Sequence, residues 1–200
     1  MRHLMQRVRV TPVVIDRSSG SAAEDVLEGY FQAKDGDRPV LLDRVFAPDA
    51  ELVVRNSSAN IAFPAVTRGR SAIAEVLVRG FALSYENVYS FYLARPGADV
   101  RHFECPWLVG MSERASGLPR VGCGRYAWSF QPDPPHLANA LVISIDVMQV
   151  APLDEFEQVF SWLRTLNYPW SSCSLSLGEI PRTESLAPIA AFLEHHAAVA

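Results

Sequence analysis

Few side chains in the sequence have the types and spacing that acid–base catalysis or metal binding needs. Asp146 is a carboxylate within the largely apolar segment 140–150, where burial would raise its pKa and suit it to general acid or base catalysis. His102 and Glu104 lie two residues apart and could contact one metal ion, but the sequence offers no third or fourth ligand. We therefore expect no metal and no cofactor, and we keep Asp146 as a candidate catalytic residue.

Nucleophilic catalysis has no support in the sequence. The chain contains no Gly-x-Ser-x-Gly motif, the sharp turn that exposes a serine nucleophile in one large class of hydrolases. Its three cysteines, Cys105, Cys123 and Cys173, form no Cys-x-x-Cys pair and have no base placed beside them. An odd number of such cysteines is typical of a reducing compartment, so we predict buried thiols and a cytoplasmic protein.

The composition fits one globular domain without a nucleic-acid or membrane partner. The 200 residues are 49% hydrophobic and 20% charged, with a formal net charge of −4. This charge gives no basic surface for nucleic acid, and no segment reaches the roughly 18 apolar residues of a membrane span. Seventeen of the 18 basic residues are arginines and only Lys34 is a lysine. Their scattered placement favours codon usage over an anion-binding role as the explanation.

The first part of the chain is predicted to be helical with one short hairpin. After a flexible arm over residues 1–20, the spacing of Ser21 and Glu24 predicts a capping box and a helix that ends near Asp35. A second helix over 37–46 precedes a strand over 51–55 and a return strand over 61–66. A third helix begins at Gly69, and its predicted buried face consists of Ile73, Val76, Leu77, Gly80 and Phe81.

The second part is predicted to be a sheet followed by helices. Segments 85–93, 101–111, 120–131 and 140–150 are extended in pattern and separated by turn residues, which favours an antiparallel sheet and an α+β domain over 21–151. Residues 152–200 form a C-terminal helical extension, with amphipathic helices over 153–166 and 186–198. We expect this extension to dock on the domain itself or on a partner subunit.

The order of these elements, together with three short motifs, resembles the nuclear transport factor 2-like superfamily, also called SnoaL-like, over about residues 21–151. The motifs are Val26-Leu27-Glu28-Gly29-Tyr30-Phe31, Phe46-Ala47-Pro48-Asp49-Ala50 and Gly69-Arg70-Ser71-Ala72-Ile73. The resemblance implies a cystatin-like cone, in which a curved antiparallel sheet wraps around the N-terminal helices and encloses an apolar pocket. It also implies a homodimer packed through the outer face of the sheet.

Strand alternation indicates which side chains face into such a cone. On the segments 101–111 and 120–131, one face carries nearly all the large apolar groups, which gain most from burial. The predicted pocket residues are Phe46, Val54, Trp107, Met111, Tyr126 and Trp128. Such a pocket suits a small hydrophobic or aromatic molecule. The alternative is that these aromatic rings fill the cone and leave no pocket.

The resemblance permits two classes of function. The superfamily includes ketosteroid isomerase, and Tyr30 falls where that family has a first-helix tyrosine, but Val54 stands at the position of the base and cannot accept a proton. Alignment with the family's last strand favours an outward Asp146 paired with Arg125, while an inward Asp146 would be catalytic. We keep two hypotheses for the function. The first is a dehydratase, cyclase or isomerase that uses Tyr30 and Asp146, and the alternative is a non-catalytic ligand-binding or accessory subunit.

Overall fold

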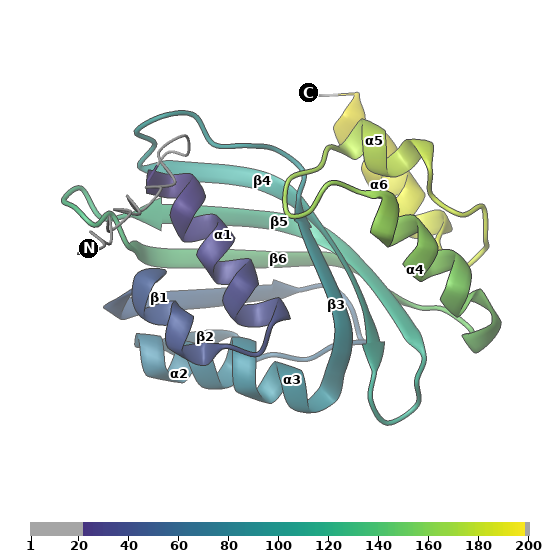
Figure 1. Cartoon of the computed structure of the whole chain (residues 1–200), viewed down its shortest axis with the longest axis horizontal. Coiled ribbons are helices and arrows are strands. Elements are labelled where there is room, and N and C mark those ends of the chain that lie inside the picture. The colour runs from purple at the N-terminus through teal and green to yellow at the C-terminus, as the bar shows by residue number, and fades with distance from the viewer. Residues whose placement is uncertain (1–21, 199–200) are drawn as a thin grey trace, which may run out of the picture.

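One curved six-stranded sheet organises the molecule, with helices on both of its faces (Figure 1). The computed structural model describes residues 22–198, so the predicted N-terminal arm and Ser21 of the predicted capping box lie outside the described residues. Across the sheet the strands are β2 (Val66–Arg68), β1 (Phe46–Asn56), β6 (Ala138–Val150), β5 (Pro119–Phe130), β4 (His102–Glu113) and β3 (Tyr85–Tyr92). Neighbouring strands are antiparallel except β1 and β6, which are parallel.

The concave face of the sheet packs against the helices of the first part of the chain. These are α1 (Ala22–Asp35), the 3-10 helix η1 (Pro39–Arg44), and a continuous helix made of α2 (Arg70–Ala74), the π-helical segment η2 (Glu75–Arg79) and α3 (Gly80–Ser84). Their apolar residues form one core with the inward residues of the strands. The predicted inward face of β4 and β5 is confirmed, since Trp107, Tyr126 and Trp128 all belong to this core.

The convex face is covered in part by the C-terminal extension, which docks on the chain's own sheet (Figure 1). The extension consists of η3 (Leu153–Glu155), α4 (Phe156–Thr165), α5 (Cys173–Gly178) and α6 (Ala187–Ala197). A second core joins the extension to outward residues of the strands, among them Leu108 and Cys123. At Gly110, an added Cβ atom would stand 2.0 Å from Leu163 Cδ1, so α4 lies directly on the backbone of β4.

The extension occupies part of the face through which the resemblance predicted a homodimer. At the other end of the convex face, His102, Glu104 and Arg125 are exposed. Dimerisation through the outer face stays a prediction, and the uncovered part of that face is the surface left for it.

Three local expectations differ from the structure. Phe46 begins β1, where the pattern predicted the end of a helix, and the predicted return strand is a loop over 57–65 followed by the short β2. In the third helix, the π-helical segment buries Val78 and leaves Gly80 exposed, opposite to the 3.6-residue expectation, because a π turn holds an extra residue.

Candidate functional site

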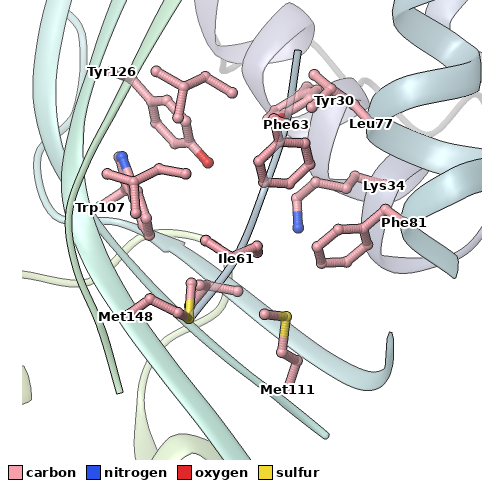
Figure 2. Close-up of a pocket in the computed structure, with 13 residues that line it drawn as sticks. Tyr30, Lys34, Ile61, Phe63, Leu77, Phe81, Trp107, Met111, Tyr126 and Met148 are labelled. Atoms are coloured by element: carbon pink, nitrogen blue, oxygen red, sulfur yellow. The ribbon is translucent and has the colours of Figure 1, made fainter. Parts of the chain in front are cut away.

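A narrow apolar cavity lies between α1, the α2–α3 helix and the concave face of the sheet (Figure 2). It offers about 50 Å³ to water-sized molecules. The empty space around it, including its opening to solvent, is about 430 Å³, which suits a ligand no larger than one substituted ring. The residues that line it are Tyr30, Lys34, Ile61, Phe63, Leu77, Phe81, Trp107, Val109, Met111, Tyr126, Ile143, Ile145 and Met148.

Two tyrosines from different elements meet in this cavity. Tyr30 comes from α1 and Tyr126 from β5, with ring centroids 6.1 Å apart and planes nearly perpendicular, and their hydroxyl groups are hydrogen-bonded to each other. Burial is the main cause that raises the pKa of both phenols above the ordinary value of 10.0, so both are neutral near pH 7. One shared hydrogen bond uses one of the two O–H groups, which leaves the pair a further proton to donate.

Lys34 brings an ammonium group to the same cavity. It lies four residues after Tyr30 on α1, so both side chains project from one face of that helix. Lys34 is 6% exposed, and its Nζ atom lies 2.6 Å from Asp35 Oδ1 and 2.7 Å from Ser90 Oγ. Within residues 22–198 these bonds use two of its three N–H groups. The ammonium also stands 4.8 Å from the centroid of the Phe81 ring, a cation–π distance.

Asp35 holds the ammonium and is itself held from several sides. Its Oδ1 atom accepts from Lys34 and, at 2.9 Å, from Ser90 Oγ, while its Oδ2 atom accepts from the Ser90 backbone N–H at 3.0 Å. The hydroxyl of Tyr168, from the C-terminal extension, donates to Oδ2 at 3.3 Å. Asp35 does not line the cavity, so this carboxylate neutralises the Lys34 ammonium from outside the cavity.

Trp107 adds a donor that has no partner. Its indole Nε1 is buried and makes no hydrogen bond within the described part of the chain, although Trp107 lines the cavity and stacks on Tyr126 at 5.5 Å between ring centroids. A buried unpartnered N–H costs free energy, which a bound acceptor would recover. The walls of the cavity therefore contain a lysine, a tyrosine pair and a tryptophan with an unpartnered N–H.

The loop over 57–65 closes one side of the cavity with Ile61 and Phe63. Asn60 fastens this loop to the sheet, since its side-chain amide donates to Met148 O at 2.7 Å. Arg120 donates from β5 to the carbonyl oxygen of Asn60. In Figure 2 the Tyr126 hydroxyl, from the sheet side, and the Lys34 nitrogen, from the helix side, lie on opposite sides of the space above Ile61.

The structure separates the predicted site residues. Tyr30, Trp107, Met111 and Tyr126 line the cavity. Phe46, Val54 and Trp128 do not, and this corrects the prediction that they line the pocket: they are buried in the adjoining core. The Phe46 and Trp128 rings stack 5.8 Å apart, so part of the aromatic set fills the cone, as the alternative supposed, and part of it borders a cavity.

Asp146 lies on the opposite face of the sheet from the cavity. Its Oδ2 atom is 3.7 Å from Arg125 Nε on the convex side, the outward pairing that the alignment favoured. A bulge explains the local register, because Cys123 pairs with Val147 and the next residue pairs with Ile145, which leaves Asp146 as the extra residue. The bulge also turns Met148 inward where alternation predicted Val147. The structure thus corrects the placement of Asp146 as a catalytic group of this cavity.

Lys34 is the residue that sequence reasoning missed. The composition could have indicated it, because Lys34 is the one lysine among 18 basic residues. It also lies on the same face of its helix as the buried apolar residues. Within residues 22–198, no group of three or more His, Cys, Asp or Glu side chains is arranged to hold a metal ion. No helix in the same range is long and apolar enough to cross a membrane.

Comparisons with known proteins identify the fold. No family profile matches the chain, and no curated protein is similar to it in sequence. A nuclear transport factor 2-like superfamily protein from Salmonella enterica is 19% identical with a TM-score of 0.50, over 63% of this chain and 92% of its own. An isomerase candidate from Rhodopseudomonas palustris is 14% identical with a TM-score of 0.51, over 72% of this chain and 98% of its own. A type 2 hexachlorocyclohexane dehydrochlorinase is 11% identical with a TM-score of 0.51, over 66% of this chain and 87% of its own.

Proposed function

The chain has the nuclear transport factor 2-like fold, and from the groups inside that fold we propose that it binds a small, mainly apolar molecule with one oxygen acceptor. The observation that carries this proposal is the gathering of donors, from Lys34, the Tyr30–Tyr126 pair and Trp107, in an otherwise apolar cavity. Sites for small molecules combine apolar walls with a few polar groups that fix orientation.

The donors favour an acceptor as the polar group of the ligand. Lys34 has a third N–H, the tyrosine pair has a free O–H, and the Trp107 indole has an unpartnered N–H. Among residues 22–198, no carboxylate lines the cavity to receive a proton or a hydrogen bond. A carbonyl, ether or ester oxygen meets this set of groups, whereas an amine does not.

Charge balance favours a neutral ligand over an anionic one. Asp35 lies 2.6 Å from the Lys34 ammonium, and both side chains are 7% exposed, so the pair carries no net charge into the cavity. A bound carboxylate would leave one uncompensated negative charge in an apolar space. We therefore favour a single-ring ketone or ester as the class of ligand.

Three matched one-ring compounds test this proposal: acetophenone, ethylbenzene and benzoate. Calorimetric titration should give the tightest binding for acetophenone, because it combines an apolar ring with a neutral acceptor. The double substitution Lys34→Met with Asp35→Asn removes the ammonium without leaving a buried unpaired charge. We expect the double variant to bind acetophenone about tenfold more weakly, which is the effect of losing one hydrogen bond to a charged donor. Its affinity for ethylbenzene should stay unchanged.

The control for that variant is Arg79→Met, which removes an exposed basic group paired with Glu75 outside the cavity. Circular dichroism and thermal unfolding check that each variant is folded. Equal binding of the three compounds, or no loss of acetophenone affinity in the double variant, would contradict the proposal.

Catalysis is the second candidate, and the buried donors are the observation that favours it. Donors fixed in an apolar cavity stabilise negative charge that develops on a substrate oxygen, as in enolisation of a ketone. Because no carboxylate or histidine lines the cavity within residues 22–198, the α-proton would pass to water or hydroxide from solvent. Two of the structural neighbours are described as an isomerase candidate and a dehydrochlorinase. Proton NMR of acetophenone in D₂O with the protein tests this candidate: catalysed loss of the methyl proton signal supports an enzyme, and its persistence at the uncatalysed rate supports a binding protein.

A further inference from the structure

The C-terminal extension reaches beyond the convex face and contacts Asp35, the carboxylate that holds Lys34. After α4 the chain turns around the edge of the sheet, where the Tyr92 N–H donates to Pro169 O and the Ser171 N–H donates to Tyr92 O, both at 2.9 Å. These bonds pair the segment Tyr168–Ser171 with the free edge of β3, and the pairing at Tyr92 and Trp170 is parallel. The extension therefore continues the sheet at the edge of β3.

Trp170 clamps this segment to α1. Its indole Nε1 donates to Glu28 Oε1 at 2.8 Å, and its ring stacks on Tyr92 with 5.0 Å between centroids. The Arg95 guanidinium lies 5.2 Å from the centroid of the same indole ring, a cation–π distance. The segment is thus anchored by polar and aromatic contacts immediately after the residue that reaches Asp35.

Tyr168 is that residue. Its hydroxyl donates to Asp35 Oδ2 at 3.3 Å, while the Oδ1 atom of the same carboxylate holds Lys34 at 2.6 Å. Burial and the charge of Asp35 raise the pKa of Tyr168 above its ordinary value of 10.0, so this phenol remains a donor at neutral pH. Apart from Lys34 itself, the other group that bonds to Asp35 within the described residues is Ser90, from β3.

We propose that Tyr168 is a positioning residue of the ligand site, which orients Asp35 and through it directs the Lys34 ammonium into the cavity. The proposal rests on the proposed function for its effect on affinity, but its effect on Lys34 is independent of any ligand. A carboxylate fixed at both oxygens holds its partner in one orientation, and the loss of one hydrogen bond loosens both groups. The C-terminal extension is accordingly part of the site and more than a cover for the convex face.

The test uses the full chain with Tyr168→Phe, which removes only the hydroxyl of a side chain that is 47% exposed. Because Lys34 is the one lysine of the chain, ¹⁵N-lysine labelling gives a side-chain ammonium signal from a single residue. We expect Tyr168→Phe to shift this signal and speed its hydrogen exchange in the ligand-free protein, and to weaken acetophenone about three- to tenfold.

Tyr89→Phe is the matched control. Tyr89 also packs against the extension, with its ring 6.2 Å from Phe160, and its hydroxyl makes no hydrogen bond within residues 22–198. We expect this variant to leave the ammonium signal and the affinity unchanged. An unaltered Lys34 signal in folded Tyr168→Phe would overturn the positioning role. If wild-type protein binds none of the three probes, the proposed function fails, and the ligand-free signal still decides the role of Tyr168.

Discussion

The two faces of the sheet bury their tryptophans in different ways. On the convex face, Trp162 Nε1 donates to Ser176 O at 3.0 Å, and at the sheet edge Trp170, which packs with the concave core, donates to Glu28 Oε1 at 2.8 Å. On the concave face, Trp107 and Trp128 are buried just as well, yet neither indole N–H has a partner in the described chain. One side satisfies its donors within the fold, and the other keeps some of them unused.

This difference separates a structural interface from a binding site. On the convex face, Leu163 of α4 packs against the backbone at Gly110, and the surrounding residues form a closed apolar core. The concave face keeps a cavity with a buried ammonium and two phenols. Such an arrangement costs stability unless a ligand uses the donors, which is why binding sites are places where otherwise reliable packing rules are broken.

Alkaline pH should have the largest effect, which should begin with the buried thiols and continue at higher pH with the buried phenols. Burial raises the pKa of Cys123 on the convex side above 9.0 and that of Tyr126 on the concave side above 10.0. Stability from these raised values is complete below the unfolded-state pKa and is lost as the pH rises toward the folded-state pKa. Each group should lower the free energy of unfolding by about 1.4 kcal/mol per pH unit in its window.

Urea unfolding between pH 8 and pH 11 measures these slopes. Cys123→Ala should reduce the slope above about pH 9, and Tyr126→Phe should reduce it only above about pH 10. Slopes that are the same in both variants and in wild type would show that these two groups do not control alkaline unfolding.

Leu163→Ala should give the next largest effect. The side chain is fully buried between α4 and β4, so its truncation should lower the free energy of unfolding by about 2–5 kcal/mol. Denaturant titration measures this change, with Leu175→Ala as a control because Leu175 is 41% exposed in the same extension. Acetophenone affinity of the folded variant should stay within about twofold of wild type, since Leu163 lies outside the cavity. A large loss of affinity would contradict the view that the convex face is structural and only the concave face binds the ligand.

Substitution of one tryptophan on each face tests the same comparison, with a smaller expected effect on stability. Trp162→Phe removes a buried hydrogen bond and leaves Ser176 O unpartnered, whereas Trp107→Phe removes an N–H that bonds to nothing in the described chain. Both substitutions lose similar volume, so the first should destabilise the fold by about 1–3 kcal/mol more than the second. Thermal unfolding compares the two variants directly. Equal destabilisation would mean that the unpartnered donor of Trp107 is not a distinguishing property of the concave face.

Asp146→Asn should have the smallest effect. The carboxylate pairs with Arg125 at 3.7 Å on the convex surface, where Arg125 is well exposed, and such pairs contribute about 0–1 kcal/mol. Neither acetophenone binding nor any exchange of its methyl protons should change. A loss of either activity in this variant would restore Asp146 as a functional residue.

Much of the sheet could be predicted because alternation is a local property. Large apolar groups recur at every second position of β4 and β5, and the structure places Trp107 and Tyr126 inward as that pattern requires. The pattern failed beyond Asp146, where a bulge inserts one residue and Met148 takes the inward place predicted for Val147. At Gly124 an added Cβ atom would stand 1.9 Å from Ser144 O on the neighbouring strand. Such close approach depends on a strand that is distant in sequence, and periodicity does not contain it.

The sequence by itself determined the α+β class, the inward aromatic face of the sheet and the amphipathic extension, because these follow from the spacing of apolar residues along single elements. Only the tertiary structure decided which of those aromatics border a cavity and which fill the core. It also assembled the group around Lys34, since Ser90 lies 56 residues from Lys34 and Tyr168 lies 133 residues from Asp35. Contacts over such separations are set by how the sheet curves and where the extension crosses its edge, and no local pattern records either.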